Sequence, residues 1–135
     1  MKQSRGIVVL MLAGLWLFAF IGCSQPTPEE LASLAAKGYY DHLIRGEYEH
    51  FLEGLDERPN IDSADYRSQL LDCYAQFVAQ QENDHRGILE VRVSNAKTDT
   101  IQKYTNVFLV LCYGDSTNEE IVVPMVEREG RWRMK

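Results

Sequence analysis

Three histidines and three cysteines are the residues of this chain with the widest range of chemistry. Histidine serves as a general acid or base near neutral pH, and histidine and cysteine are common zinc ligands. The spacing of His42, His50 and His85 does not match an HExxH motif, and neither Cys73 nor Cys112 has a second cysteine or a histidine at ligand spacing. The sequence also contains no glycine-rich phosphate loop and no nucleophile elbow. It therefore predicts no metal site and no bound cofactor.

The third cysteine ends an apolar segment at the N-terminus. Lys2 and Arg5 give this segment a positively charged start, residues 7–21 carry no charge, and Gly22 precedes Cys23. A charged start, a short apolar run and a small residue at the cleavage site are typical of a secretory signal peptide. A membrane-spanning helix is the alternative, but it needs roughly 20 apolar residues and this run is shorter. We therefore predict that residues 1–22 are a signal peptide.

The four residues Phe20-Ile21-Gly22-Cys23 resemble the bacterial lipobox, with Phe20 in place of the usual leucine. This resemblance implies that Cys23 is the lipid attachment site, carrying a thioether-linked diacylglycerol and an amide-linked acyl chain such as palmitate. Several acyl chains are enough for stable anchoring, so the membrane is an expected partner through the N-terminal lipid. Ser24, rather than Asp, follows the cysteine, which by the same resemblance implies the outer membrane of a Gram-negative cell envelope. Soluble export after cleavage and an uncleaved anchor stay open as alternatives.

Removal of residues 1–22 leaves 113 residues, the length of a single domain. It also removes two basic residues and no acidic ones, so the formal net charge changes from −6 to about −8. Nucleic-acid binding depends on clustered Lys and Arg, so an acidic domain predicts no nucleic-acid partner. Residues 23–28, which include Pro26 and Pro28, are expected to form a lipidated tether, with the folded domain at 29–135.

Two cysteines remain besides Cys23, and both have apolar neighbours. A free cysteine in such a neighbourhood behaves as a small hydrophobic residue, which favours buried thiols at Cys73 and Cys112. An oxidising compartment also permits a Cys73–Cys112 disulfide, and this alternative stays open.

Helical periodicity predicts three helices, at residues 28–45, 47–55 and 64–83. Thr27 is the expected N-cap of the first helix, with Pro28 at its first position. Each helix has an apolar stripe expected to face the core, and the stripes are Leu31, Ala32, Ala35, Ala36, Tyr39 and Leu43; Tyr48, Phe51, Leu52 and Leu55; and Tyr66, Leu70, Cys73, Tyr74 and Phe77.

The apolar period changes to two after residue 87. Leu89, Val91 and Val93 alternate with polar residues, which predicts a strand buried on one side, followed by a polar loop at 97–102. Within the next strand, at 104–113, six consecutive apolar residues indicate a central strand covered on both faces.

Two further strands are predicted at 120–128 and 131–135, joined by the turn Glu129-Gly130. Helices followed by an antiparallel meander predict an α+β fold, with the N-terminal helices packed on one face of a curved antiparallel sheet. Such a sheet and its helices enclose a half-open cone, the obvious ligand site. The strand residues expected to face this interior include no ionisable group, and they are Val91, Val93, Val107, Leu109, Leu111, Ile121, Val123, Met125, Trp132 and Met134.

Four short segments resemble small bacterial lipoproteins that carry a domain of unknown function with a nuclear-transport-factor-2-like (NTF2-like, cystatin-like) fold. These segments are Ala36–Leu43 with its Tyr39-Tyr40 pair, Arg45-Gly46-Glu47-Tyr48, Tyr113-Gly114-Asp115 and Val126–Trp132. The resemblance covers about residues 30–135. It implies a conical α+β roll with a pocket or a dimer-forming sheet face, and it implies no established reaction, so no catalytic residue is assigned.

Four residues are the candidates for ligand binding: Tyr39, His42, Tyr74 and Trp132. A tyrosine or tryptophan combines an apolar body with a polar tip, and His42 lies at the edge of an apolar stripe, where it is suited to the rim of a pocket. The alternative for each is ordinary packing of the helices and the sheet.

Three functions follow from these expectations. The first is a non-catalytic envelope lipoprotein that binds a small apolar molecule or an envelope protein. The second is an enzyme resembling the isomerases and dehydratases of this fold, with His42 and a tyrosine as its catalytic groups. The third is a structural module that forms a homodimer through an apolar outer sheet face at Phe108, Val110 and Val122.

Overall fold

The computed structural model describes residues 24–57 and 63–135. The predicted signal peptide and Cys23 lie outside this part of the chain, as does most of the connector before the third helix. The helices are α2 (Pro28–Ile44), α3 (Tyr48–Glu53) and α4 (Ala64–His85), and the strands are β1 (Ile88–Asp99), β2 (Tyr104–Tyr113), β3 (Asn118–Arg128) and β4 (Arg131–Met134). None of the helices in these ranges is long and apolar enough to cross a membrane.

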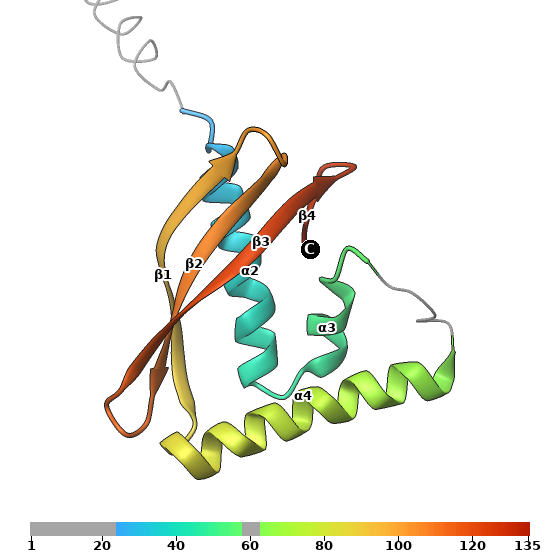
Figure 1. The fold of residues 1–135 in the computed structure, drawn as a ribbon, viewed down its shortest axis with the longest axis vertical. Helices are drawn as coiled ribbons and strands as arrows, with labels where there is room; N and C mark the ends of the chain where they lie inside the picture. The colour runs from blue at the N-terminus through green and yellow to red at the C-terminus, as the bar shows by residue number, and fades with distance from the viewer. Residues whose placement is uncertain (1–23, 58–62) are drawn as a thin grey trace, which may run out of the picture.

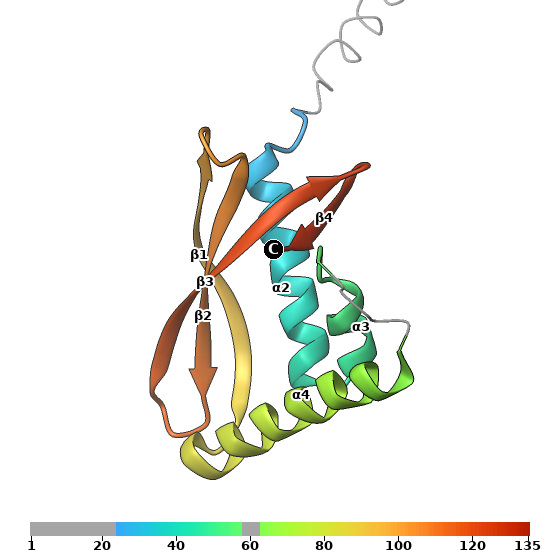
Figure 2. The same ribbon diagram turned by 45° about the vertical axis from the view of Figure 1, so that its right-hand side comes forward.

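The strands form one antiparallel sheet in the order β1-β2-β3-β4, which confirms the predicted meander. Helix α2 lies along one face of this sheet, and α4 crosses beyond the ends of α2 and the strands (Figures 1 and 2). The arrangement is the predicted α+β fold. The start of α2 is at one end of the molecule, and α4 is at the other (Figure 1).

Helix α2 begins as the sequence predicts. The Thr27 hydroxyl accepts a hydrogen bond from Glu30 N at 3.2 Å, while the Glu30 carboxylate accepts one from Thr27 N at 3.4 Å. This capping box satisfies two backbone donors, and Pro28 at the first helical position needs none. The helix therefore starts at a defined residue, directly after the tether.

The core lies between α2 and the inner face of the sheet. The buried α2 residues are Ala32, Ala36 and Leu43, and the two alanines let the helix approach closely. Every second residue of β2 faces them, and all five are buried: Thr105, Val107, Leu109, Leu111 and Tyr113. The intervening residues of β2 are half-buried, so the prediction that this strand is covered on both faces is wrong. On the outer face, Val122 is 52% exposed.

Strand β1 is longer and less regular than predicted. It continues to Asp99, so part of the expected loop at 97–102 is strand, and only residues 100–103 form the turn. Register shifts between Ile88 and Glu90 and between Val93 and Asn95 interrupt the alternation. A bulge adds one residue to a strand and so reverses which residues face inward. As a result Leu89 is 70% exposed. Val93 keeps its inward register opposite buried Leu109, but it is 40% exposed.

The third predicted helix forms, but it has no buried residue. Tyr74 and Val78 of α4 pack against the core, whereas Cys73 is exposed and Phe77 is 36% exposed. Cys112 lies on the half-buried outer face of β2, and both thiols are free. The prediction of two buried thiols is therefore wrong, because α4 crosses the end of the sheet instead of lying on it. Leu31 of α2 is also 40% exposed, since it lies beyond the edge of the buried stripe.

We expect Leu109→Ala to lower the free energy of unfolding by about 2–5 kcal/mol, as for other fully buried leucines. Leu109 is 0% exposed and lies between α2 and the sheet. The matched control is Val110→Ala, one residue along on the half-buried outer face, for which we expect a clearly smaller loss. Urea unfolding of both variants measures the difference, and equal losses would contradict the assignment of the inner face.

Candidate functional site

A cavity of about 400 Å³ lies between the inner face of the sheet and the three helices. We call it the tyrosine-lined cavity, and its lining residues are Tyr40, Leu43, Phe51, Tyr74, Phe77, Leu111, Glu119 and Ile121. Its volume is within the range of small-molecule sites, and its walls are apolar and aromatic with few polar groups, as such sites usually are. It occupies the place of the predicted cone interior.

Three aromatic rings from three helices connect the walls of this cavity. The rings of Tyr40 in α2 and Phe51 in α3 meet edge to face, with their centroids 5.3 Å apart. Phe51 meets Tyr74 of α4 in the same way at 4.9 Å. Edge-to-face contacts of this kind are favourable beyond the area that they bury. Because α4 has no buried residue, this chain of rings is a principal attachment of α4 to the other helices.

The two tyrosines of the cavity stay protonated at neutral pH. Burial raises the pKa of Tyr40 above its ordinary value, and the neighbouring Tyr74 raises it further. Burial also raises the pKa of Tyr74, with smaller contributions from Tyr66 and Cys73. A protonated phenol can donate one hydrogen bond and accept others. The cavity therefore offers hydrogen-bonding groups without a buried charge on either tyrosine.

The prediction that the inward-facing strand residues include no ionisable group is wrong at Tyr113, which is buried on the inner face of β2, and at Glu119. Glu119 pairs with Leu111, whose side chain faces inward, so Glu119 faces the same way and lines the cavity. Strand β3 begins at Asn118, two residues earlier than predicted, so the inward-facing alternation continues from Ile121 back to Glu119. Glu119 is exposed, and its carboxylate accepts a hydrogen bond from the Tyr113 hydroxyl at 2.5 Å.

Tyr113 and His85 connect the cavity to the end of α4. Burial and, as the next largest cause, the hydrogen bond to Glu119 raise the pKa of Tyr113 to about 12. The His85 ring stacks on the Tyr113 ring with a centroid distance of 4.2 Å, and His85 Nδ1 lies 2.9 Å from Asp115 Oδ2. The hydroxyl of Thr117 donates to Asp115 Oδ1 at 2.5 Å. These contacts, that of the Thr117 hydroxyl most of all, lower the pKa of Asp115 to about 2.

The turn after β2 requires a glycine at residue 114. A Cβ there would lie 2.4 Å from the Arg86 carbonyl oxygen, a distance that real Cβ atoms do not adopt. Gly114 N donates to Gly87 O at 2.9 Å, and Asp115 N donates to His85 O at the same distance. The end of α4 therefore packs directly on the backbone of the β2–β3 turn.

Two of the predicted ligand-binding residues line a different cavity. Tyr39 and His42 lie in a cleft of about 340 Å³ between α2, α3 and the start of β4, and its other lining residues are Ala35, Gly38, His50, Glu53 and Arg131. The rings of His42 and His50 stack with a centroid distance of 4.7 Å. His42 Nδ1 lies 3.3 Å from Glu47 Oε1. This cleft is more polar than the tyrosine-lined cavity.

The four predicted residues therefore do not form one site. Tyr74 lines the tyrosine-lined cavity, and Tyr39 and His42 line the second cleft. The Tyr39 hydroxyl donates to the Trp132 carbonyl oxygen at 2.7 Å, which joins α2 to β4. Trp132 packs against the core, and it lines neither of these two cavities.

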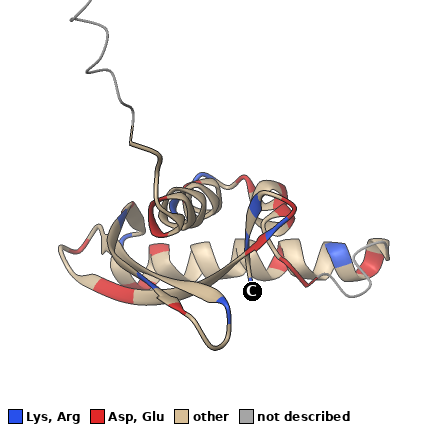
Figure 3. Cartoon of the chain, turned by 90° about the horizontal axis from the view of Figure 1, so that it is seen from above, with Lys and Arg blue, Asp and Glu red and all other residues tan. Residues whose placement is uncertain are grey.

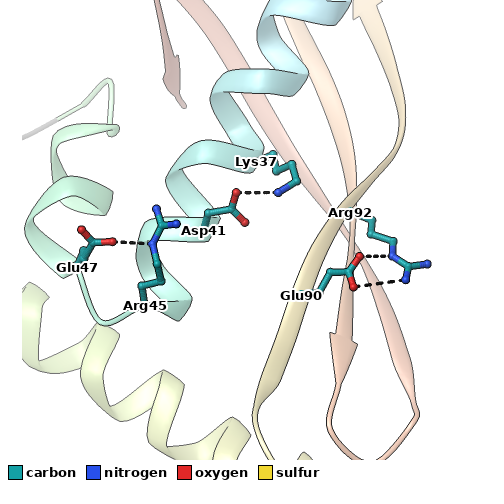
Figure 4. Close-up of polar contacts among 6 residues, drawn as sticks. All are labelled: Lys37, Asp41, Arg45, Glu47, Glu90 and Arg92. Carbon is teal, nitrogen blue, oxygen red and sulfur yellow. Dashed lines mark hydrogen bonds and ion pairs between the residues drawn. The ribbon is translucent and has the colours of Figure 1, made fainter.

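Surface charges of both signs are distributed over several elements (Figure 3). Lys37 pairs with Asp41 within α2 at 2.7 Å, and Arg92 Nε pairs with Glu90 in β1 at 2.5 Å (Figure 4). Glu47 Oε1 lies 2.7 Å from Arg45 Nε in addition to its contact with His42. The hydrogen bond from Arg45 and, after it, that from His42 lower the pKa of Glu47. Glu47 thus stays charged and shares that charge between two partners.

No protein-family model matches the sequence, and no curated protein matches it at a significant level. Among solved structures, the fold is similar to that of a Campylobacter jejuni protein, provisionally described as an NTF2-like transpeptidase, with a TM-score of 0.58. The match covers 73% of this chain and 92% of that chain, at 11% sequence identity. The chain has an NTF2-like fold. At this identity the similarity establishes the fold alone. It confirms the NTF2-like domain that the resemblance of the four short segments predicts.

The lining of the tyrosine-lined cavity is mainly apolar and aromatic. Of the residues described, those that line it include no serine, cysteine, lysine or histidine. Its one carboxylate, Glu119, is exposed and hydrogen-bonded to Tyr113.

The lowered pKa of Asp115 predicts a dependence of stability on pH. A carboxyl whose pKa is lower in the folded state stabilises that state above its unfolded value, and this contribution is lost as the pH falls through the folded value. We therefore expect Asp115→Asn to be less stable than the wild type near neutral pH. The difference should shrink as the pH falls from about 4 towards about 2.

Urea midpoints of both proteins across this pH range measure the effect. Asp72→Asn, on the exposed side of α4, is the control, because it removes a charge from the same end of the molecule without touching His85 or Thr117. A difference between Asp115→Asn and wild type that does not change with pH would contradict the coupling.

Proposed function

We propose that this protein is a non-catalytic lipoprotein of the cell envelope whose NTF2-like domain binds a small apolar ligand in the tyrosine-lined cavity. The observation that carries the proposal is the lining itself, which has five apolar side chains besides the two protonated phenols and only one carboxylate. The expected ligand is an apolar molecule, ring-containing or branched, with a single hydrogen-bonding group. That group would meet a phenol or Glu119, and the remainder would pack on the aromatic rings.

The position of the cavity along α2 agrees with an anchor at Cys23. The lipobox-like sequence ends at Cys23, and α2 begins at Pro28. The cavity residues Tyr40 and Leu43 lie in the last turns of this helix, about 20 Å further along at 1.5 Å per residue. A lipid at the tether would therefore leave the cavity well away from the bilayer, where it could take up a ligand from the periplasm.

The catalytic alternative with His42 and a tyrosine has less support. Tyr39 is the tyrosine that shares a cleft with His42, and its hydroxyl already donates to the backbone of Trp132. The name of the Campylobacter jejuni protein describes that protein, and the tyrosine-lined cavity contains no residue that could serve as the nucleophile of a transpeptidase. Binding without catalysis is the simpler interpretation of both the tyrosine-lined cavity and the cleft with His42.

We expect Cys23→Ala to leave the protein without acyl chains and outside the membrane fraction, because the thiol is the proposed attachment point. Mass spectrometry of the purified protein and fractionation of the envelope measure the two effects. Cys73→Ala is the matched control, since that thiol is exposed in the folded domain and lies far from the tether. Unchanged acylation and membrane association of Cys23→Ala would refute the anchor.

We expect Ile121→Trp to abolish binding of the neutral apolar fluorophore N-phenyl-1-naphthylamine, because the larger ring fills the cavity. Val122→Trp places the same ring one residue along, on the opposite face of β3, and should bind the probe as the wild type does. Titration of both variants, with circular dichroism as a check of folding, tests the proposal. Equal binding by the two folded variants would show that the probe does not occupy this cavity.

A further inference from the structure

The end of the domain next to the tether presents exposed apolar side chains. Ile101, in the turn between β1 and β2, is 90% exposed, more than any other large apolar residue in the described part of the chain. Leu34 of α2 is 69% exposed and Leu31 is 40% exposed. The Thr98 hydroxyl at the end of β1 donates to Glu29 Oε1 in the first turn of α2 at 2.6 Å. The hairpin and the start of α2 are therefore neighbours, as Figures 1 and 2 show.

Ile101 lies in a turn that hydrogen bonds hold in one conformation. Asp99 Oδ1 accepts hydrogen bonds from Ile101 N at 2.9 Å and from Gln102 N at 3.0 Å. The Asp99 carbonyl oxygen accepts a third, from Lys103 N at 2.9 Å, and Lys103 has a φ of 60°. Such an Asx turn holds the backbone in one conformation. The isoleucine side chain is therefore held outwards, and nothing else in the described chain covers it.

The tether sets how far this end of the domain can be from a lipid at Cys23. Four residues, 24–27, lie between Cys23 and Pro28, and the five Cα-to-Cα steps from one to the other span at most about 18 Å when fully extended. Tyr104 follows the turn, and Lys135 Nζ lies 5.1 Å from the centre of its ring. Tyrosine and lysine beside an exposed apolar side chain are typical of a surface at the boundary between lipid and water.

We propose that the β1–β2 turn inserts Ile101 into the surface of the bilayer to which the protein is anchored, so that the anchored domain has a fixed orientation. The inference rests on the proposed acylation of Cys23. The charged residues at this end balance one another in sign, and they are Lys97, Lys103 and Lys135 against Glu29, Glu30 and Asp99. Docking should therefore depend on insertion of the apolar side chain and not on an anionic lipid.

The test uses the full-length acylated protein, purified from membranes and reconstituted into phosphatidylethanolamine–phosphatidylglycerol vesicles that contain acyl-brominated lipid. Ile101→Trp places a fluorophore at the turn. Asp72→Trp places one on α4 at the other end of the molecule, and the wild-type protein gives the background from Trp132. Bromine quenches tryptophan only within the bilayer. We expect the added emission of Ile101→Trp to shift to the blue and to be largely lost, and that of Asp72→Trp to be retained.

A second variant tests the same contact without a new fluorophore. Ile101→Asp should lower the ratio of docked to free domain roughly tenfold or more, the factor expected when one isoleucine side chain is no longer buried. Hydrogen exchange measures this as a loss of vesicle-dependent protection in residues 99–104, while the protein still floats with the vesicles.

The outcomes separate the two proposals. Flotation with vesicles but equal quenching at residues 101 and 72 would overturn the docking and leave the anchor in place. Failure of the wild-type protein to carry acyl chains or to float would overturn the anchor, and the docking with it. Protection that depends on phosphatidylglycerol and is unchanged in Ile101→Asp would also overturn the inference, because it would assign the contact to charge.

Discussion

Burial of the inner face of the sheet beneath α2 is the contact on which the other features of this domain depend. Five alternate residues of β2 are buried, and Ala32 and Ala36 allow the helix to lie close to them. Apolar burial contributes roughly 25 cal/mol per Å², so this layer supplies much of the stability of a small domain. The same contact fixes the direction of α2 along the sheet. It thereby places the tether at one end of the molecule and the last turns of the helix, with Tyr40 and Leu43, at the other.

The tyrosine-lined cavity exists because α4 does not lie on the sheet. A helix packed along the sheet would fill the space above Leu111 and Ile121 with its own side chains. Helix α4 instead crosses the end of the sheet, held by the rings of Phe51 and Tyr74 at one point and by the close approach of Arg86 to Gly114 at another. None of the residues of α4 is fully buried, and Tyr74 and Val78 are those that pack against the core. A ligand that packs against Tyr74 and Phe77 would add to the contacts of α4 as well as occupy the cavity.

The two ends of the domain differ in the chemistry that they present. Near the tether, a turn held by Asp99 carries an exposed isoleucine. At the other end, the aromatic cavity adjoins a polar network of His85, Tyr113, Asp115 and Glu119. This difference between the two ends matches the proposed arrangement of an anchored domain, in which one end meets the bilayer and the other binds a ligand. The polar cleft with Tyr39 and His42 borders the same last turns of α2, on another face of the helix.

Local patterns in the sequence determined the elements of this fold, their order and the α+β class. Periods of 3.6 and 2, a capping box at Thr27 and a turn at Glu129-Gly130 act over a few residues and can be read directly. Tertiary structure decided which apolar stripes are covered, and this is why Cys73, Leu89 and Leu31 are exposed although their patterns suggested burial. Two bulges in β1 and the crossing of α4 depend on contacts between distant segments, which no local pattern records. For the same reason the sequence could name Tyr74 as a candidate but could not place Glu119 in the same cavity or Tyr39 and His42 in a different one. A cavity is defined by residues that only packing brings together.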